Sequence, residues 1–388
     1  MKVSGIVCEY NPFHNGHLHH IEQTRKNGAD RIICVMSGNF VQRGDVAILD
    51  KFTRAELAVM SGADLVIELP VQYCLSSAEN FASAAVFLLE NTGIVNEISF
   101  GSESGNIQDL INASEISDKL SDSAEIRELM KKGYTYPKAF SEILKEKNKI
   151  AYEIFTSPNN ILAIEYLKAL RRFDSHISPF TVKREGAFHD SSLTADNIAS
   201  ASYIRKHLEI AGKYVPELWA KALDGETASL ERLERVIMYK IRTSTASEIA
   251  DTSDIPAGLA ERIIAAGNAT SLDGIFEAVK TKAFTMARVK RTILSLLIGI
   301  TKADMAELPP YIRILAFNRN GRELMKAMKT AKKIPVGTSL ADLRRINPTA
   351  ERFALLESRG TDIYNLTLKV PGTTQTEFRK KITENLCS

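Results

Sequence analysis

The feature that most constrains the fold lies near the N-terminus, where an apolar segment leads into a helical pattern within a few residues. Val3–Val7 is apolar and rich in β-branched residues, which predicts a strand. Asn11–Pro12 ends this strand, because proline cannot donate to a ladder and restricts the residue before it. Helical spacing of apolar residues begins at Leu18. The motif His14-x-Gly16-His17 therefore lies at a strand-to-helix corner.

A corner of this kind suits an anion. The first N–H groups of a helix have no partner within the helix, and the helix dipole places partial positive charge there. Gly16 has no side chain, so a ligand can approach the backbone closely. His14 and His17 share one face if the turn is helical, and each ring can donate an N–H to a phosphate oxygen. The corner predicts a triphosphate site without a Walker-A loop. Taken alone, the motif fits a capped helix end that binds nothing equally well.

Strand and helix patterns alternate through residues 1–210. Strands are predicted at Val3–Val7, Arg31–Met36, Asp64–Leu69, Ile94–Phe100 and Phe180–Lys183. Helices are predicted at Thr53–Ser61, Ser77–Glu90, 106–120, 122–132, Ile161–Arg171 and Ser200–Ile210. Because strands separated by helices pair in parallel through right-handed crossovers, this half predicts an α/β domain with a Rossmann-like parallel sheet.

In such sheets, ligands bind beyond the carboxyl ends of the strands. We therefore expect the segments that follow the five strands to converge on one cleft: Asn11–His17, Ser37–Asp45, Pro70–Tyr73, Gly101–Gly105 and Arg184–Asp190. Arg43, in the second segment, can pair with a phosphate or a carboxylate, although a solvated loop explains it as well.

Other polar residues near these segments carry separate predictions. Lys51 and Arg54 begin a predicted helix, where cations oppose the dipole, so a role in the site is favoured. Ser200 or Ser202 can cap a helix, and with Arg205 one turn later they offer a second phosphate cradle or a plain capped helix. For His189–Asp190 a loop role is favoured over a catalytic pair, because adjacent side chains on a loop seldom point together.

From residue 211 onward, helical periodicity predominates. Helices are predicted at Leu230–Ile241, Ala257–Ala266, Leu272–Val279, Met286–Gly299, Tyr311–Phe317 and Gly321–Lys329, and one late strand at Ile363–Leu368. Residues 211–388 therefore predict a second, mostly α-helical domain.

Two basic stretches of this second half bear on its function. One holds Lys282, Arg288 and Arg291 close to Phe284, and the other runs from Arg319 to Lys333. Basic side chains mixed with an aromatic suit an RNA backbone and an unstacked base. A solvated amphipathic face explains either stretch as well.

Composition limits the class of protein. The 388 residues are 44% hydrophobic and carry a net charge of only +3, so a nucleic-acid surface must come from local clustering. Cys8, Cys34, Cys74 and Cys387 show no C-x-x-C spacing, which disfavours a zinc site or a disulfide framework and suits a reducing cytosol. We see no signal peptide and no apolar segment of bilayer length, so a cytoplasmic protein without a membrane partner is expected.

The motifs resemble those of a known family. His14-x-Gly16-His17 after a strand resembles the H-x-G-H signature of the nucleotidyltransferase superfamily, and Ile198–Arg205 resembles its I-S-S-T-x-x-R signature, with departures at Ala199 and Ser202. The longer set resembles bacterial tRNA(Met) cytidine acetate ligases more closely: Glu9–His17, Met36–Gly38, Gln42–Gly44, Phe100–Gly105 and Ser157–Leu162.

The resemblance implies an activity and a set of site residues. The family joins acetate to N4 of the wobble cytidine of elongator tRNA(Met), with ATP and Mg²⁺, through an acetyl-adenylate. By this likeness, His14, His17 and Arg205 are catalytic, and Lys282, Arg288 and Arg291 contact tRNA. The implied ATP site comprises Val7, Cys8, Glu9, Tyr10, Asn11, Pro12, Phe13, His14, Asn15, Gly16, His17, Leu18, His19, His20, Gly101, Asn160, Arg184, Ser200 and Ser202. No metal ligand and no obligate protein partner is implied.

Two other functions stay open on the sequence. A small-molecule adenylyl- or cytidylyltransferase shares the H-x-G-H and Ser/Arg signatures, but such enzymes can work without a large basic helical domain. A non-catalytic RNA-binding protein that retains a nucleotide fold is the third candidate, and the presence of His14, His17 and Arg205 argues against it.

Overall fold

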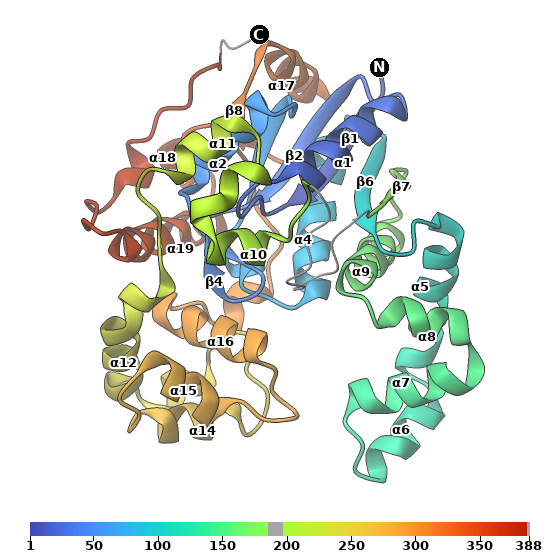
Figure 1. Cartoon of the computed structure of the whole chain (residues 1–388), viewed down its shortest axis with the longest axis vertical. Coiled ribbons are helices and arrows are strands. Elements are labelled where there is room, and N and C mark those ends of the chain that lie inside the picture. Colours follow the sequence, from blue (N-terminus) through green and yellow to red (C-terminus); the bar gives the residue numbers. More distant parts are fainter. Residues whose placement is uncertain (185–196, 386–388) are drawn as a thin grey trace.

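A seven-stranded sheet forms the centre of the molecule (Figure 1). The computed structural model describes residues 1–184 and 197–385. Strand order is β7 (Ser178–Lys183), β6 (Glu97–Ser102), β1 (Val3–Cys8), β2 (Arg31–Ser37), β5 (Leu65–Leu69), β8 (Ile312–Phe317) and β9 (Val336–Gly337). The first five strands pair in parallel, β8 pairs antiparallel to β5, and β9 is parallel to β8. The α/β prediction and its five strands are confirmed.

Both faces of the sheet are covered, as the continuous apolar runs of its strands require. In β2, Ile33 and Val35 pack on the side of α4 (Ala78–Asn91) and α9 (Pro158–Arg172). The alternate residues of β2 pack on the other side, with α1 (Asn15–Lys26), α2 (Lys51–Met60) and α11 (Glu217–Leu223). The predicted helices at Thr53–Ser61, Ser77–Glu90 and Ile161–Arg171 are thus confirmed with small changes in their ends.

Two groups of helices extend away from the sheet on opposite sides of the view in Figure 1. The first group lies between β6 and α9 and comprises α5 (Ile107–Ser121), α6 (Ala124–Lys131), α7 (Tyr136–Lys147) and α8 (Lys149–Phe155). The second comprises α12 (Glu234–Thr243), α13 (Ala246–Ala250), α14 (Leu259–Ala266), α15 (Leu272–Val279) and α16 (Met286–Ile298), and we call it the α12–α16 module. The hydrophobic core of the module includes Ile237, Ile263 and Ile293, and it continues through Phe40, Val46 and Tyr364 outside the module.

Two predictions in the second half are wrong. Ile312–Phe317, expected to be helical, is strand β8, and all six of its residues are buried between β5 and β9. A short apolar run does not distinguish a buried strand from a buried helix turn. Ile363–Leu368, expected to be a strand, comprises the end of α19 (Pro348–Tyr364) and a 3₁₀ turn at Asn365–Thr367.

The second half therefore contributes to the sheet as well as forming helices. Beside β8 and β9 it supplies α17 (Arg319–Ala331), α18 (Leu340–Leu343) and α19. The helix predicted at Ser200–Ile210 is shorter: α10 spans Ala201–Lys206, and a 3₁₀ segment follows at Leu208–Lys213. The division into domains 1–210 and 211–388 stays a prediction.

A buried cluster of charges joins the C-terminal segment to the sheet. The ammonium group of Lys51 contacts the carboxylates of Glu68, Glu357 and Glu377, and Arg313 pairs with Glu68 and Glu377. These residues come from α2, β5, β8, α19 and the segment after it. Since an unpaired buried charge is costly, the two cations and three carboxylates hold these distant segments together.

Candidate active site at the carboxyl end of the sheet

The corner between β1 and α1 fixes both imidazoles of the motif. His14 is the N-cap of α1, and its Nδ1 accepts the backbone N–H of Gly16 at 3.1 Å. His17 Nδ1 accepts the backbone N–H of His14 at 3.1 Å, which completes a reciprocal capping box. Because each Nδ1 accepts a hydrogen bond, each neutral ring carries its proton on Nε2. Each imidazole therefore has an Nε2–H left to donate to a ligand.

Burial keeps these two rings neutral. Burial, followed by the charge of Arg184, lowers the pKa of His14 to about 3. Burial, followed by His14 and Arg184, lowers the pKa of His17 well below its usual range. The two rings stack with centroids 3.8 Å apart, which two positive imidazolium rings would resist. At neutral pH the corner thus offers two neutral N–H donors.

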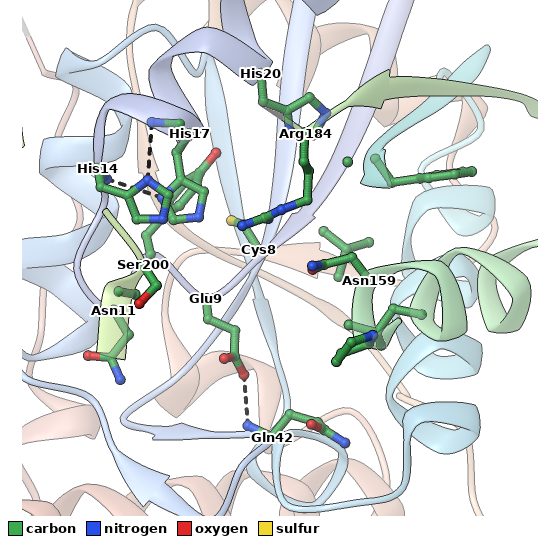
Figure 2. A pocket seen from close by; sticks show the side chains of 18 of the residues that line it. Cys8, Glu9, Asn11, His14, His17, His20, Gln42, Asn159, Arg184 and Ser200 are labelled. Atoms are coloured by element: carbon green, nitrogen blue, oxygen red, sulfur yellow. Dashed lines mark hydrogen bonds between the residues drawn. The ribbon is translucent and has the colours of Figure 1, made fainter. Parts of the chain in front are cut away.

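Positive charge comes from the strand and helix beside the corner. Arg184 directly follows β7, its side chain extends into the cavity (Figure 2), and its charge acts on His14, His17 and His20. Arg205, on α10, donates from Nη1 to the backbone oxygen of Asn11 at 2.7 Å, which ties α10 to the residues after β1. Ser200 caps α10 by accepting the N–H of Tyr203 at 3.2 Å. The predicted second cradle therefore lies next to the first one.

Glu9 is the only carboxylate among the described residues that line the cavity at this corner. Its Oε1 accepts the backbone N–H of Gln42 at 2.7 Å and the hydroxyl of Ser37 at 3.4 Å. Burial raises the pKa of Glu9, against the opposing effects of the Gln42 N–H and of Arg43, Arg205 and Arg54. Figure 2 shows its side chain between the imidazoles and Gln42.

A small hairpin connects Glu9 to the α12–α16 module. The hairpin pairs β3 (Phe40–Val41) with β4 (Asp45–Val46), and Gly44 at its turn has a φ of +74°. A side chain at Gly44 would lie 2.5 Å from the backbone nitrogen of Arg291, so only glycine permits α16 to pack this closely. Arg291 donates to the backbone oxygen of Gln42 at 3.1 Å. The hairpin is therefore held between the cavity and the module.

On the opposite side, the loop after β6 and the start of α9 cap one another. Asn160 Oδ1 accepts the backbone N–H groups of Glu103 at 2.9 Å and Ser104 at 3.1 Å. The Glu103 carboxylate in turn accepts the Asn159 amide at 2.6 Å and the backbone N–H of Asn160 at 3.0 Å. Asn159 faces the cavity, whereas Asn160 is buried and positions the loop that follows Gly101.

These elements enclose a cavity of about 420 Å³. Most of the predicted site residues line it: Val7, Cys8, Glu9, Tyr10, Asn11, His14, Gly16, His17, His19, His20, Gly101, Arg184, Ser200, Ser202 and Arg205. Five predicted residues do not: Pro12, Phe13, Asn15, Leu18 and Asn160. Phe13 instead stacks on Trp219 beneath the corner, with ring centroids 5.4 Å apart. The roles of the lining residues stay predictions.

Sequence reasoning missed the apolar wall of the cavity. Phe81 of α4, Phe100 of β6, and Leu162 and Tyr166 of α9 line it, and the rings of Phe100 and Tyr166 are 5.7 Å apart. The spacing of four between Leu162 and Tyr166, on the predicted helix Ile161–Arg171, was an available signal. Such a wall suits a planar, apolar ligand surface.

Four of the five segments that follow the strands converge on the cavity, as expected, in the parts of them that the structure describes. The exits of β1, β2, β6 and β7 all supply lining residues, but Pro70–Tyr73 after β5 does not. That exit is covered by α19 instead: Val71 N–H donates to Glu357, and Tyr73 packs against Phe353. His189 and Asp190, like Cys387, lie outside the described residues.

The site role favoured for Lys51 and Arg54 is wrong. Neither residue lines the cavity, and both are fully buried. Lys51 belongs to the charge cluster with Glu68, Glu357 and Glu377. Arg54 donates to the backbone oxygens of Glu9, Gly38 and Leu49, so it holds the ends of β1 and β2 in place. Buried partners from distant segments account for both cations.

The three predicted tRNA contacts differ in exposure. Lys282 is exposed just before α16. Arg288 is partly exposed and pairs with Asp254 at 3.0 Å. Arg291 is 7% exposed, and its guanidinium pairs with Asp254 and donates to the backbone oxygen of Gln42. This burial is at odds with direct contact between Arg291 and RNA. In the second basic stretch, Lys333 pairs with Glu90 and Arg322 with Glu384.

Neither a metal centre built from protein ligands nor a membrane-spanning helix is present in the described part of the chain. In residues 1–184 and 197–385, no three His, Cys, Asp or Glu side chains are grouped so that they could hold a metal ion. No helix of the same residues has the length and apolar character to cross a membrane.

Comparisons with known proteins agree with this geometry. A family model described as HIGH Nucleotidyl Transferase matches residues 1–379. A tRNA(Met) cytidine acetate ligase of Acetivibrio thermocellus is 37% identical, with 100% of this chain and 99% of the relative covered. One from Thermoanaerobacter sp. strain X514 is 38% identical, with 95% and 96% covered. The chain belongs to the tRNA(Met) cytidine acetate ligase family of HIGH nucleotidyl transferases.

Solved structures extend the match to the whole fold. The crystal structure of Thermotoga maritima TmcAL bound with alpha-thio ATP superposes with a TM-score of 0.90 at 29% identity, covering 99% of this chain and 100% of that one. The apo form I of the same protein gives a TM-score of 0.88 at 30% identity, with 98% and 97% covered.

Proposed function

We propose that this protein uses ATP to join acetate to N4 of the wobble cytidine of elongator tRNA(Met), forming N4-acetylcytidine through an acetyl-adenylate. The main support is the similarity to relatives named tRNA(Met) cytidine acetate ligase, which extends over nearly the full length of both chains. The similar Thermotoga structure bound with alpha-thio ATP supports ATP as the nucleotide. The cavity at the His14–His17 corner is the candidate site.

In the first step, a carboxylate oxygen of acetate attacks the α-phosphorus of ATP, and pyrophosphate leaves. Such a reaction needs positioning and stabilisation of charge more than a covalent nucleophile. The Nε2–H groups of His14 and His17 would donate to phosphate oxygens as negative charge shifts toward pyrophosphate. Their fixed tautomers mean that no ring has to reorganise during the reaction. Arg184 supplies positive charge close to both rings.

Mg²⁺ is part of this proposal because ATP reaction sites of this kind use it. The ion prefers oxygen ligands and keeps several waters, so ATP phosphates can hold most of it. Apart from Glu9, the described lining residues offer neutral donors and guanidinium groups and no carboxylate, so ATP phosphates and water would supply the oxygen ligands of the ion. When bound, Mg²⁺ neutralises part of the charge of the triphosphate.

In the second step, the cytidine amine attacks the acetyl carbon and AMP leaves. The base must be unstacked to reach the cavity, which is easiest in an anticodon loop. The α12–α16 module lies against the hairpin at the cavity, and we propose that exposed cations such as Lys282 contact the tRNA backbone. We also propose a catalytic unit at 1–210, a tRNA-binding unit at 211–388, and action in the cytoplasm.

The proposal is tested by mass spectrometry of nucleosides from elongator tRNA(Met) incubated with the protein, ATP, Mg²⁺ and acetate. We expect N4-acetylcytidine that depends on both ATP and acetate. His14→Ala protein is the matched control and should form it about 10²–10³-fold more slowly. If the wild-type protein instead releases pyrophosphate with a phosphorylated alcohol or a mononucleotide and leaves tRNA unmodified, the small-molecule nucleotidyltransferase replaces this proposal. Binding of tRNA with neither product would favour the non-catalytic protein.

A further inference from the structure

The second step needs a proton acceptor, and this inference rests on the proposed function. The lone pair of the cytidine 4-amino group is conjugated with the ring, so the amine is a weak nucleophile. As its nitrogen bonds to the acyl carbon, it must lose a proton, and a positioned base accelerates such a step. The residues assigned so far donate hydrogen bonds or supply positive charge, and none of them accepts a proton.

Most titratable groups of the cavity are unsuited to this task. His14 and His17 already use Nδ1 as an acceptor and hold their proton on Nε2. Burial raises the pKa of both Cys8 and Tyr10, which keeps these groups protonated and therefore unable to accept a proton. Glu9 is the one carboxylate among the described lining residues.

The position of Glu9 suits a proton acceptor that faces the incoming cytidine. Its side chain lies between the imidazoles, where the phosphates are proposed to bind, and Gln42 of the hairpin (Figure 2). The hairpin packs on α16 of the module proposed to hold tRNA, through Gly44 and Arg291. A cytosine ring that enters the cavity from the side of the module would therefore meet Glu9 before it meets the histidines.

The contacts of Glu9 leave part of its carboxylate available. Both of its hydrogen bonds within the described residues fall on Oε1, from the Gln42 N–H and the Ser37 hydroxyl. No lysine or arginine of the described residues forms an ion pair with it, in contrast to Glu68, Glu357 and Glu377. The backbone of Glu9 is held by Arg54. The carboxylate is thus positioned firmly, and Oε2 accepts no hydrogen bond from these residues.

We propose that the Glu9 carboxylate is the catalytic base of acetyl transfer. The N4–C bond forms while Glu9 takes a proton from N4, and the C–O bond to the adenylate breaks, so that its electron pair leaves with AMP. Glu9 then releases the proton to solvent or product. A carboxylate is a better acceptor when its pKa is raised, and burial raises that of Glu9.

Separate assays of the two half-reactions test this role. Hydroxylamine, a strong nucleophile that needs no base, traps acetyl-adenylate as acetyl hydroxamate, whereas a single-turnover assay reports transfer to tRNA. We expect Glu9→Gln to slow transfer by about 10²–10⁴-fold and to change hydroxamate formation by less than about tenfold. Glutamine keeps an oxygen that can accept the Gln42 N–H, so the hairpin contact is retained. Ser37→Ala, which removes the other contact of Oε1 but keeps the charge, is the matched control and should transfer within a few-fold of wild type.

A pH profile separates a base from a residue that only supports the hairpin. Transfer by the wild type should fall as pH drops through the pKa of Glu9, and Glu9→Gln should lack this limb. Arg43, Arg54, Arg205, Tyr166 and Cys74 are the charged and titratable groups whose interactions with Glu9 would shape that limb. Equal losses in both half-reactions, or transfer by Glu9→Gln at the wild-type rate, would overturn the proposal. Absence of hydroxamate with the wild-type protein would instead refute the proposed function.

Discussion

His14 combines a structural and a chemical function in one ring, and two substitutions can separate them. Its Nδ1 caps α1 by accepting the Gly16 N–H, and its Nε2–H is left for a ligand. His14→Asn keeps a side-chain oxygen that can accept the same N–H, because asparagine is among the preferred N-cap residues. The asparagine amide is too short to replace Nε2. His14→Ala removes both functions.

The two functions differ in the size of their expected effects. Loss of one donor to developing charge costs about 10²–10³-fold in rate, or about 2.7–4 kcal/mol of transition-state stabilisation. Loss of an N-cap costs about 1 kcal/mol of folding free energy. Both variants lose the stacking of His14 on His17, so that contribution cancels when they are compared with each other. We expect equal losses of activity and a difference in stability of about 1 kcal/mol.

The assays are acetate-dependent pyrophosphate release and urea unfolding. His14→Asn should lose activity by about 10²–10³-fold while it remains about 1 kcal/mol more stable than His14→Ala. Binding of tRNA by both variants should match the wild type, because the ring lies at the nucleotide corner. A His14→Asn protein that releases pyrophosphate within threefold of the wild-type rate would refute the donor role of Nε2. Equal stability of the two variants would refute the cap.

Three further predictions follow from burial and charge. Since burial lowers the pKa of His14 from 6.5 to about 3, the unfolded chain binds the proton first, and the free energy of unfolding should fall as pH drops from 6.5 toward 3. The rate of pyrophosphate release should then show no change with an apparent pKa near 6.5. Such a change would mean that the imidazole of His14 takes up a proton in that range. Lys51→Met leaves three buried carboxylates with Arg313 alone and should cost about 3–5 kcal/mol in urea unfolding, whereas exposed Lys329→Met should cost almost nothing. Lys282→Ala should reduce the salt dependence of tRNA affinity by about one ion, whereas Arg291→Ala should lower stability and leave that slope unchanged.

The N-terminal corner was predictable because its signals are local. The strand, the break at Asn11–Pro12 and the helix start lie within one short stretch, and the motif fixes which residues stand at the helix end. The protonation state was not predictable in the same way. That both rings accept through Nδ1, and are neutral because they are buried, depends on geometry and on Arg184, which is distant in the sequence.

Strand β8 shows why the second half was harder to predict. Its six residues, Ile312–Phe317, are apolar except for Arg313, and no turn signal joins them to the N-terminal strands. They become a strand because β5 offers an unpaired edge far away in the sequence. Arg313 is tolerated there because Glu68 and Glu377 neutralise it. Tertiary pairing thus overrides a local pattern that a helix satisfies equally well.

The charged residues near the site show the same limit most sharply. The sequence favoured a ligand role for Lys51, as a cation at a predicted helix start, and suggested an RNA role for Arg291, as part of a basic stretch. In the structure each has carboxylate partners, Glu68, Glu357 and Glu377 for Lys51 and Asp254 for Arg291, and these partners account for the charge. Glu9 stands even closer to the motif but has only hydrogen bonds from Gln42 and Ser37 and no ion pair among the described residues. A buried carboxylate without a direct ion pair costs stability, and acceptance of the proton released by the attacking amine gives Glu9 a function that accounts for its place in the cavity.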